Sequence, residues 1–312
     1  MSETNGRIMR TYGGTKVTLV SGTGATLRDA EGRSYVDFLA GISVMSLGHS
    51  APVVREAIAR ASVELQHVSN FFGNPHTIAL AEALNRHLEC GSGQVFFCNS
   101  GAEANEAAFK LARKWGRGSR FGIVSAVNSF HGRTFGALAA TGQPGKQLPF
   151  RPLPEGFSHV PYSDIDALAH ALEDTTICAV ILEPIMGEGG VVDPDPGYLQ
   201  AVRTLTSRAG VLLIMDEVQT GMCRTGRWFG FQHDGIIPDI VTMAKALGNG
   251  YPIGAMWARD EVAAAFSPGD HGTTFGGSAM AGAVGVAVIG EMERLGLAEV
   301  AERRGMELRT RL

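Results

Sequence analysis

Lys245 is a candidate catalytic residue because of the residues that flank it in the sequence. It follows an apolar run and precedes two glycines in VTMAKALGNG, residues 241–250. Burial among apolar side chains disfavours the ammonium form, and the free amine can then attack a carbonyl and form an imine. Taken alone, a lysine is far more often a solvated surface charge, so a chemical role for Lys245 depends on the residues that lie near it.

A second candidate, Asp216, ends the apolar run LLIMD, residues 212–216. A carboxylate at this position has low-dielectric surroundings and needs a cationic partner. The partner can be a metal ion, an Arg or Lys side chain, or the protonated nitrogen of a heterocycle. The neighbouring strand ends offer no His or second Asp at ligand spacing, so we predict no metal site.

The third candidate is the stretch NSGAEANEAAFK, residues 99–110, where a predicted strand gives way at once to a helix. The Ser100 hydroxyl and the free N–H groups at a helix start make a natural phosphate site. A plain helix cap by Ser100 is the alternative. Together, a phosphate site, an acid for a ring nitrogen and an imine-forming lysine match one ligand, pyridoxal 5'-phosphate (PLP).

The elements that must position these residues alternate between strands and helices. We expect an α/β fold with a mostly parallel central sheet and helices on both faces, in which strand ends gather at one edge. An antiparallel meander is expected at 17–41, and the chain is predicted to be helical from 278 to its last residue. Strands are predicted at 94–99, 122–127, 178–184, 211–217, 239–244 and 253–258, and helices at 76–89, 102–115 and 197–210.

Several longer stretches carry a family resemblance. They run in order from about residue 37 to 277: DFLAGISVMSLGHSAP, FFCNSGAEANEAAFKLAR, FHGRTFGALAATGQ, LEPIMGEGGV, LLIMDEVQTGMCRTG, PDIVTMAKALGNGYPIGA and HGTTFGG. The chain thereby resembles the class III, or subgroup II, aminotransferases, PLP enzymes of fold type I, and most closely their acetylornithine and ornithine branch.

For the cofactor ring, the resemblance implies five residues. Lys245 joins the cofactor aldehyde as an imine and later moves a proton between substrate and cofactor. Asp216 holds the ring nitrogen protonated, Val218 and Phe130 pack on the two ring faces, and Gln219 lies near the phenolic oxygen. Lys245 and Asp216 are the predicted catalytic pair.

For the phosphate, the resemblance implies Ser100, Gly101 and Ala102 of the same chain. Thr274 matches a threonine that reaches the phosphate of a neighbouring subunit, with Thr273 a weaker candidate. A homodimer with shared active sites is therefore expected.

For the substrate, Arg133 matches an arginine that grips a carboxylate, and Glu188 matches a glutamate that masks a second arginine. Arg133 pairing with a core acid, and Glu183 serving only as a structural acid, are the alternatives. The resemblance implies transfer of the δ-amino group of N2-acetyl-L-ornithine to 2-oxoglutarate, in arginine biosynthesis. Ornithine, succinylornithine and 4-aminobutyrate are alternative amino donors. A different kind of alternative is that the chain is an inactive truncated fragment and not an enzyme.

The resemblance also divides the chain. Residues 1–48 are expected to belong to a small domain, 49–290 to a large PLP-binding domain, and 291–312 to the start of a C-terminal small domain that is otherwise missing. The family's second carboxylate-binding arginine is expected in that missing part.

Composition sets outer limits on function. The 312 residues carry 27 Lys and Arg against 31 Asp and Glu, a net charge of −4, so neither nucleic acid nor an anionic membrane is an expected partner. The four cysteines are far apart, and no apolar leader or membrane span is recognisable, which favours the cytoplasm. Neither glycine-rich stretch has the spacing of a dinucleotide or nucleotide loop.

Overall fold

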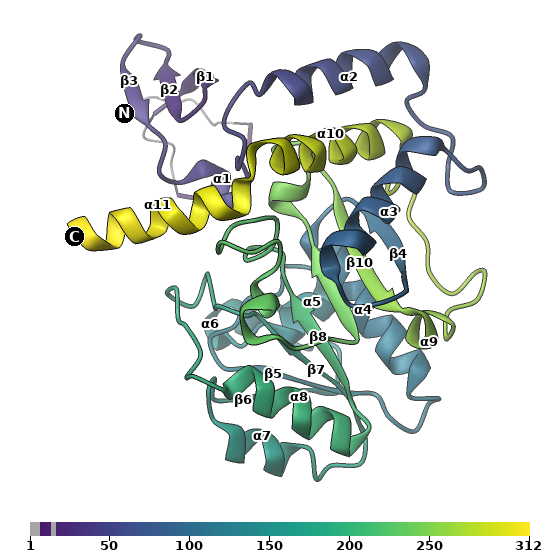
Figure 1. The fold of residues 1–312 in the computed structure, drawn as a ribbon. Helices are drawn as coiled ribbons and strands as arrows, with labels where there is room; N and C mark the ends of the chain where they lie inside the picture. Colours follow the sequence, from purple (N-terminus) through teal and green to yellow (C-terminus); the bar gives the residue numbers. More distant parts are fainter. Residues whose placement is uncertain (1–6, 14–16) are drawn as a thin grey trace.

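The computed structural model describes residues 7–13 and 17–312, and a central sheet of seven strands organises most of them (Figure 1). The order across the sheet is β4-β10-β9-β8-β7-β5-β6. The strands are β4 (Gly93–Cys98), β5 (Gly122–Ala126), β6 (Phe157–Val160), β7 (Ile177–Leu182), β8 (Leu212–Asp216), β9 (Ile240–Met243) and β10 (Gly254–Arg259).

The sheet is mostly parallel, as predicted. The pairs from β9 through β8, β7 and β5 to β6 are parallel, and only β10 runs antiparallel to its neighbours β4 and β9. All six strands predicted from apolar runs are present. β6 was missed because its sequence, FSHV, is short and only half apolar.

Helices cover both faces of this sheet (Figure 1). The alternation of side chains along β8 shows how: Leu212 and Ile214 pack in one core with α4, while Leu213 and Met215 pack in the other with α3, α8 and α10. The helices are α1 (Ala40–Ser43), α2 (Pro52–Glu64), α3 (Pro75–Leu88), α4 (Gly101–Trp115), α5 (Phe135–Ala140), α6 (Pro144–Gln147), α7 (Ile165–Ala171), α8 (Tyr198–Ala209), α9 (Asp260–Ala263), α10 (Ala279–Leu295) and α11 (Leu297–Arg311), with 3₁₀ turns η1 (Leu148–Phe150), η2 (Gly230–Asp234) and η3 (Lys245–Leu247).

The two ends of the chain lie outside the central sheet. The predicted meander is confirmed as an antiparallel sheet of β1 (Leu19–Thr23), β2 (Thr26–Asp29) and β3 (Ser34–Val36). The prediction of a helical chain from 278 onward is confirmed, although two helices, α10 and α11, make up this part and a turn at Gly296 separates them. Gly296, with φ of 54°, ends α10 in the left-handed conformation, and α11 starts at the next residue.

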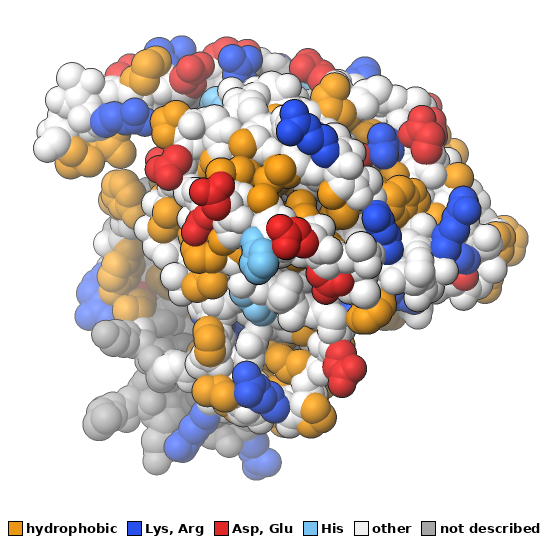
Figure 2. Space-filling model, turned by 90° about the horizontal axis from the view of Figure 1, so that it is seen from below, with side chains coloured by type: hydrophobic (Ala, Val, Ile, Leu, Met, Phe, Trp, Pro, Cys, Tyr) orange, Lys and Arg blue, Asp and Glu red, His pale blue; other side chains and the backbone are white. Residues whose placement is uncertain are grey.

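The surface and the cysteines agree with the composition. On the face shown in Figure 2, basic and acidic side chains are interspersed among apolar ones. All four cysteines are free thiols. Within the described residues, no helix combines the length and the apolar character that crossing a membrane requires.

Candidate active site

A cavity of about 430 Å³ lies where β8 and β9 end, which is a typical volume for a small-molecule site. It brings together every predicted site residue except Thr274. The predicted residues that line it are Ser100, Gly101, Ala102, Phe130, Arg133, Glu188, Asp216, Val218, Gln219 and Lys245.

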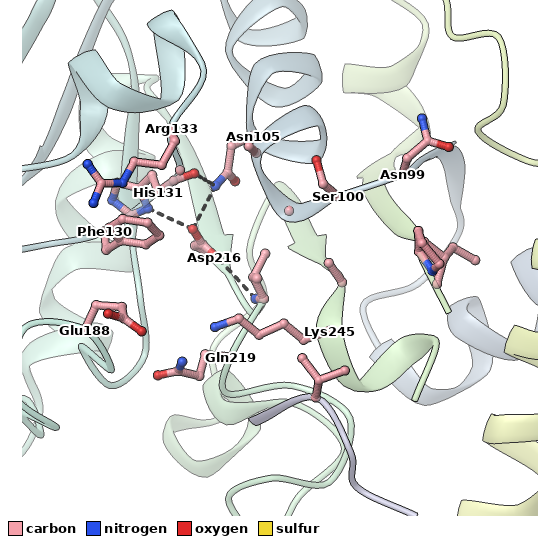
Figure 3. Close-up of a pocket in the computed structure, with 18 of the residues that line it drawn as sticks. Asn99, Ser100, Asn105, Phe130, His131, Arg133, Glu188, Asp216, Gln219 and Lys245 are labelled. Atoms are coloured by element: carbon pink, nitrogen blue, oxygen red, sulfur yellow. Dashed lines mark hydrogen bonds and ion pairs between the residues drawn. The ribbon is translucent and has the colours of Figure 1, made fainter. Parts of the chain in front are cut away.

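Asp216 is the most firmly held of these side chains. It ends β8, whose five residues are all buried, and only 3% of Asp216 is exposed. Its Oδ2 accepts hydrogen bonds from Asn105 Nδ2 at 2.9 Å and His131 Nδ1 at 2.8 Å, and its Oδ1 accepts from the Val218 N–H at 3.0 Å (Figure 3). Three donors compensate the buried carboxylate for the loss of water.

Lys245 follows the adjacent strand β9 and has a different environment. Its φ of 46° places a non-glycine residue in the left-handed region, a strained conformation that is common at functional sites. Burial lowers the pKa of its ammonium group, although the charges of Asp216, Glu188 and Glu183 oppose this shift. Within the described part of the chain, no hydrogen bond holds the Lys245 amine, which extends into the cavity (Figure 3).

The start of α4 forms another wall. Ser100 caps this helix, since its Oγ accepts the Glu103 N–H at 3.2 Å. The cap does not exclude a phosphate site, because the Ser100 hydroxyl can still donate its own hydrogen. The cap leaves the N–H groups of Gly101 and Ala102 unused by other described residues. A Cβ at Gly101 would lie 2.7 Å from both Val218 methyl carbons, so only glycine lets the helix begin this close to Val218.

Phe130 and Arg133 lie together on the opposite wall. The guanidinium carbon of Arg133 is 5.7 Å from the centre of the Phe130 ring. Among the described residues, Arg133 has no acid within ion-pair distance and is exposed, which contradicts the alternative that it pairs with a core acid. Its guanidinium is therefore available to a ligand.

Glu183 and Glu188 belong to the segment after β7. Glu183 is buried, and its two oxygens accept the N–H groups of Phe130 at 2.9 Å and Gly187 at 3.2 Å. Burial raises the pKa of the Glu183 carboxyl to about 7. Glu188 is exposed at the cavity wall (Figure 3). Glu183 thus ties the Phe130 backbone to the loop that carries Glu188.

Thr274 does not face this cavity within the chain. It is exposed and lines a separate hollow that also contains Phe71 and Phe96. Thr273 lines the same hollow but is less exposed, and its Oγ1 accepts hydrogen bonds from Asn99 Nδ2 and the Gly276 N–H.

Asn105 and His131, whose side chains donate hydrogen bonds to Asp216, were not predicted from the sequence. Both are buried, at 1% and 2% exposure. The sequence contains a weak indication of each residue. Asn105 interrupts the alanine-rich buried face of α4, and His131 is next to Phe130. No group of three or more potential metal ligands occurs within residues 7–13 and 17–312.

Comparison with known proteins places these features in a family. The family model Aminotransferase class-III matches residues 8–312. The chain is 51% identical over 305 residues to the acetylornithine aminotransferase of Streptomyces coelicolor and 53% identical over 305 residues to that of Mycobacterium tuberculosis. Each alignment covers 97% of this chain and 75% of the relative.

Solved structures agree with the sequence relatives. An ornithine aminotransferase from Toxoplasma gondii, with partial occupancy of PLP at its active site, superposes with a TM-score of 0.94 at 38% identity, over 98% of this chain and 73% of that chain. An aminotransferase from Bacillus anthracis gives a TM-score of 0.91 at 30% identity, over 96% of this chain and 74% of that chain.

Proposed function

The chain belongs to the class III aminotransferases, and we propose that it transfers the δ-amino group of N2-acetyl-L-ornithine to 2-oxoglutarate. The two acetylornithine aminotransferases compared above share about half of its residues. The observation that carries the proposal is the juxtaposition, in one cavity, of the free Lys245 amine, the clamped Asp216 carboxylate and the exposed Arg133 guanidinium.

The residues present fit PLP, the cofactor of this family. The N–H groups of Gly101 and Ala102 and the Ser100 hydroxyl would hold the phosphate at the start of α4. Glycine at position 101 allows the helix start to lie against Val218, because a Cβ there would collide with the Val218 side chain. Asp216 would hold the ring nitrogen in its protonated form.

The remaining cofactor contacts follow from the walls of the cavity. Phe130 and Val218 would cover the two faces of the ring, and Gln219 would lie near its phenolic oxygen. When bound, PLP supplies an aldehyde that exchanges with amino groups and a ring that withdraws electrons from the substrate carbon.

Lys245 is proposed as the residue that holds the cofactor aldehyde and moves the proton. Because burial lowers the pKa of its ammonium group, a larger fraction of Nζ is the free amine near neutral pH. No hydrogen bond within the described residues restrains that amine, so it is free to reach a substrate proton. Lys245 and Asp216 are the proposed catalytic residues.

Arg133 and Glu188 are proposed to select the substrate. Both substrates carry carboxylates, and the planar guanidinium can bind one with two parallel hydrogen bonds. Glu188 adds a negative charge on the same wall, where it would bind a second cationic group in the absence of a diacid.

We also propose a cytoplasmic homodimer. Thr274 lies beside Phe71 and Phe275, which are 92% and 66% exposed, and such apolar surface favours a protein contact. A second copy seated there would bring its phosphate site near Thr274. Sedimentation velocity should give a dimer, and a monomer that remains fully active would contradict this arrangement.

The test of the reaction is a comparison of amino donors with 2-oxoglutarate as acceptor. We expect kcat/KM to be highest for N2-acetylornithine, with glutamate formed in equal amount. Ornithine, succinylornithine and 4-aminobutyrate are the competing donors. Equal or better turnover of any of them would assign the chain to another branch of the family, and no turnover of any would favour the inactive-fragment alternative.

A further inference from the structure

Asn105 is the one polar residue among the buried residues of α4, whose other buried members are alanine, phenylalanine and leucine. Asparagine is a poor residue for a helix interior, and a buried amide costs free energy unless its hydrogen bonds are satisfied. Alanine, used at four buried positions of this helix, would serve packing alone. The amide therefore calls for an explanation.

Its hydrogen bonds supply one. Asn105 Nδ2 donates to the main-chain oxygen of His131 at 2.7 Å and to Asp216 Oδ2 at 2.9 Å, while Asn105 Oδ1 accepts from Thr242 Oγ1 at 2.7 Å. A flipped amide would place its oxygen against two acceptors and lose both donated bonds. These two acceptors therefore select the orientation of the amide, and Thr242, which is fully buried on β9, satisfies the amide oxygen in that orientation.

The result is an asymmetric carboxylate. Among the described residues, Asp216 Oδ2 receives two donors, Asn105 Nδ2 and His131 Nδ1, whereas Oδ1 receives only the Val218 N–H. Oδ1 is thus the oxygen with the greater capacity left for a ligand in the cavity. His131 Nδ1 must carry a hydrogen here, because its partner is an acceptor that already takes the Asn105 amide.

The same bonds join the parts that hold the cofactor. Asn105 belongs to α4, which begins at the phosphate site. Asp216 and Thr242 are paired across β8 and β9, and Lys245 follows Thr242 by three residues. One amide therefore fixes the distance between the acid, the helix start and the strand that leads to the lysine.

We propose that Asn105, supported by the hydrogen bond from Thr242, is a positioning residue that directs the Asp216 carboxylate at the ring nitrogen of PLP. The inference rests on the proposed function, since it concerns the same cofactor. Asn105 is not proposed to touch the cofactor. It acts on the cofactor through the Asp216 carboxylate.

The experiment compares two ligands on the cofactor-free chain by spectroscopic titration: PLP, and the analogue in which C–H replaces the ring nitrogen. Because the analogue cannot use Asp216, its affinity does not report the orientation of that carboxylate. For Asn105→Leu we expect Kd for PLP to rise about tenfold and Kd for the analogue to rise less than about twofold, since one hydrogen bond to a charged group is lost.

Three further variants isolate the cause. Thr242→Val removes the hydroxyl but keeps the branched shape, and it should raise Kd for PLP more than Kd for the analogue, by a smaller factor than Asn105→Leu. Thr242→Ser keeps the hydroxyl and should retain the parent values of both. Leu111 lies in the buried face of α4 but outside this network. Leu111→Ala should lower the melting temperature and change Kd for PLP and for the analogue by the same factor.

The outcomes are distinct. Equal losses of both ligands in Asn105→Leu would make Asn105 a merely structural residue and overturn the inference. If Asn105→Leu does not fold, the same comparison in Thr242→Val decides the matter. A parent chain that binds PLP no better than the analogue would overturn the inference alone, whereas a parent that binds neither would overturn the proposed function with it.

Discussion

The ends of the neighbouring strands β8 and β9 present two opposite solutions to the burial of a charge. Asp216, at the end of β8, is nearly inaccessible and accepts three hydrogen bonds. Lys245, just past the end of β9, lies in strained backbone and extends into the cavity with no hydrogen bond from the described residues. Both side chains line the same cavity, but hydrogen bonds restrain Asp216 and not Lys245.

The difference follows from what each group must do. A carboxylate that only holds a charge benefits from rigid donors, which lower its energy and fix its direction. An amine that must take up and release a proton benefits from being partly desolvated and free to move, because strong hydrogen bonds would stabilise one protonation state. The chain therefore holds Asp216 with hydrogen bonds, whereas only the more distant charges of Asp216, Glu188 and Glu183 offset the burial of Lys245 among the described residues.

Replacement of Lys245 should have the largest effect. Lys245→Ala removes the amine and should lower kcat by at least about ten-thousandfold, with no covalent cofactor adduct after borohydride reduction and intact-mass measurement. The melting temperature should change little, because the Lys245 amine makes no hydrogen bond to any residue that the structure describes. Lys245→Arg is the matched control that keeps the charge. Turnover near the parent value in either variant would remove the assignment of Lys245.

Replacement of Asp216 should have the next largest effect. Asp216→Asn keeps the shape and an acceptor for Asn105 and His131, but it removes the negative charge offered to the ring. We expect kcat/KM to fall by at least about a hundredfold while the protein stays folded. Asp216→Ala should also lose stability, since Asn105 and His131 would then lack an acceptor. Comparable activity of Asp216→Asn and the parent would show that charge at β8 is not needed.

Arg133 offers a third case, a charged group whose expected partner is the substrate. Arg133→Lys keeps the charge but loses the planar fork, so KM for 2-oxoglutarate should rise about tenfold, with a smaller change in kcat. Arg133→Leu should raise KM further. Steady-state kinetics measure both effects, and a change confined to kcat would argue against carboxylate binding.

The sequence was sufficient to place Asp216 and Lys245 at one edge of the sheet. Apolar runs identify buried strands, parallel strands end together, and polar residues after such runs must then meet. The capping pattern at Ser100 is equally local. These features depend on residues near each other in the chain, so a reading of periodicity and spacing finds them.

The support around Asp216 could not be found in this way. Asn105 and His131 are 111 and 85 residues from Asp216 in the sequence, and their contact depends on how closely α4 and the segment after β5 approach β8. The missed strand β6 and the break at Gly296 have another cause. Both are short features, in which one or two residues outweigh the pattern of their neighbours.

The smallest predicted effect tests the compensation argument on a second acid at the end of β8. Glu217 is buried, and its oxygens accept bonds from Thr220 Oγ1 and the N–H groups of Gly230 and Phe231. Removal from water nevertheless outweighs these donors and raises the pKa of its carboxyl from 4.5 to about 7. The pKa of Glu183 is raised to the same value, also by burial.

A raised pKa means that the folded protein binds protons that the unfolded chain has already released. The stabilisation from Glu183 and Glu217 is therefore complete below about pH 4.5 and is lost as the pH rises to about 7. Urea unfolding of the cofactor-free protein across this range should show a falling free energy of unfolding. In Glu183→Gln/Glu217→Gln the slope should be shallower than in the parent, whatever the absolute stability. A parallel pH dependence of the two proteins would mean that the hydrogen-bond donors around Glu183 and Glu217 offset the cost of their burial.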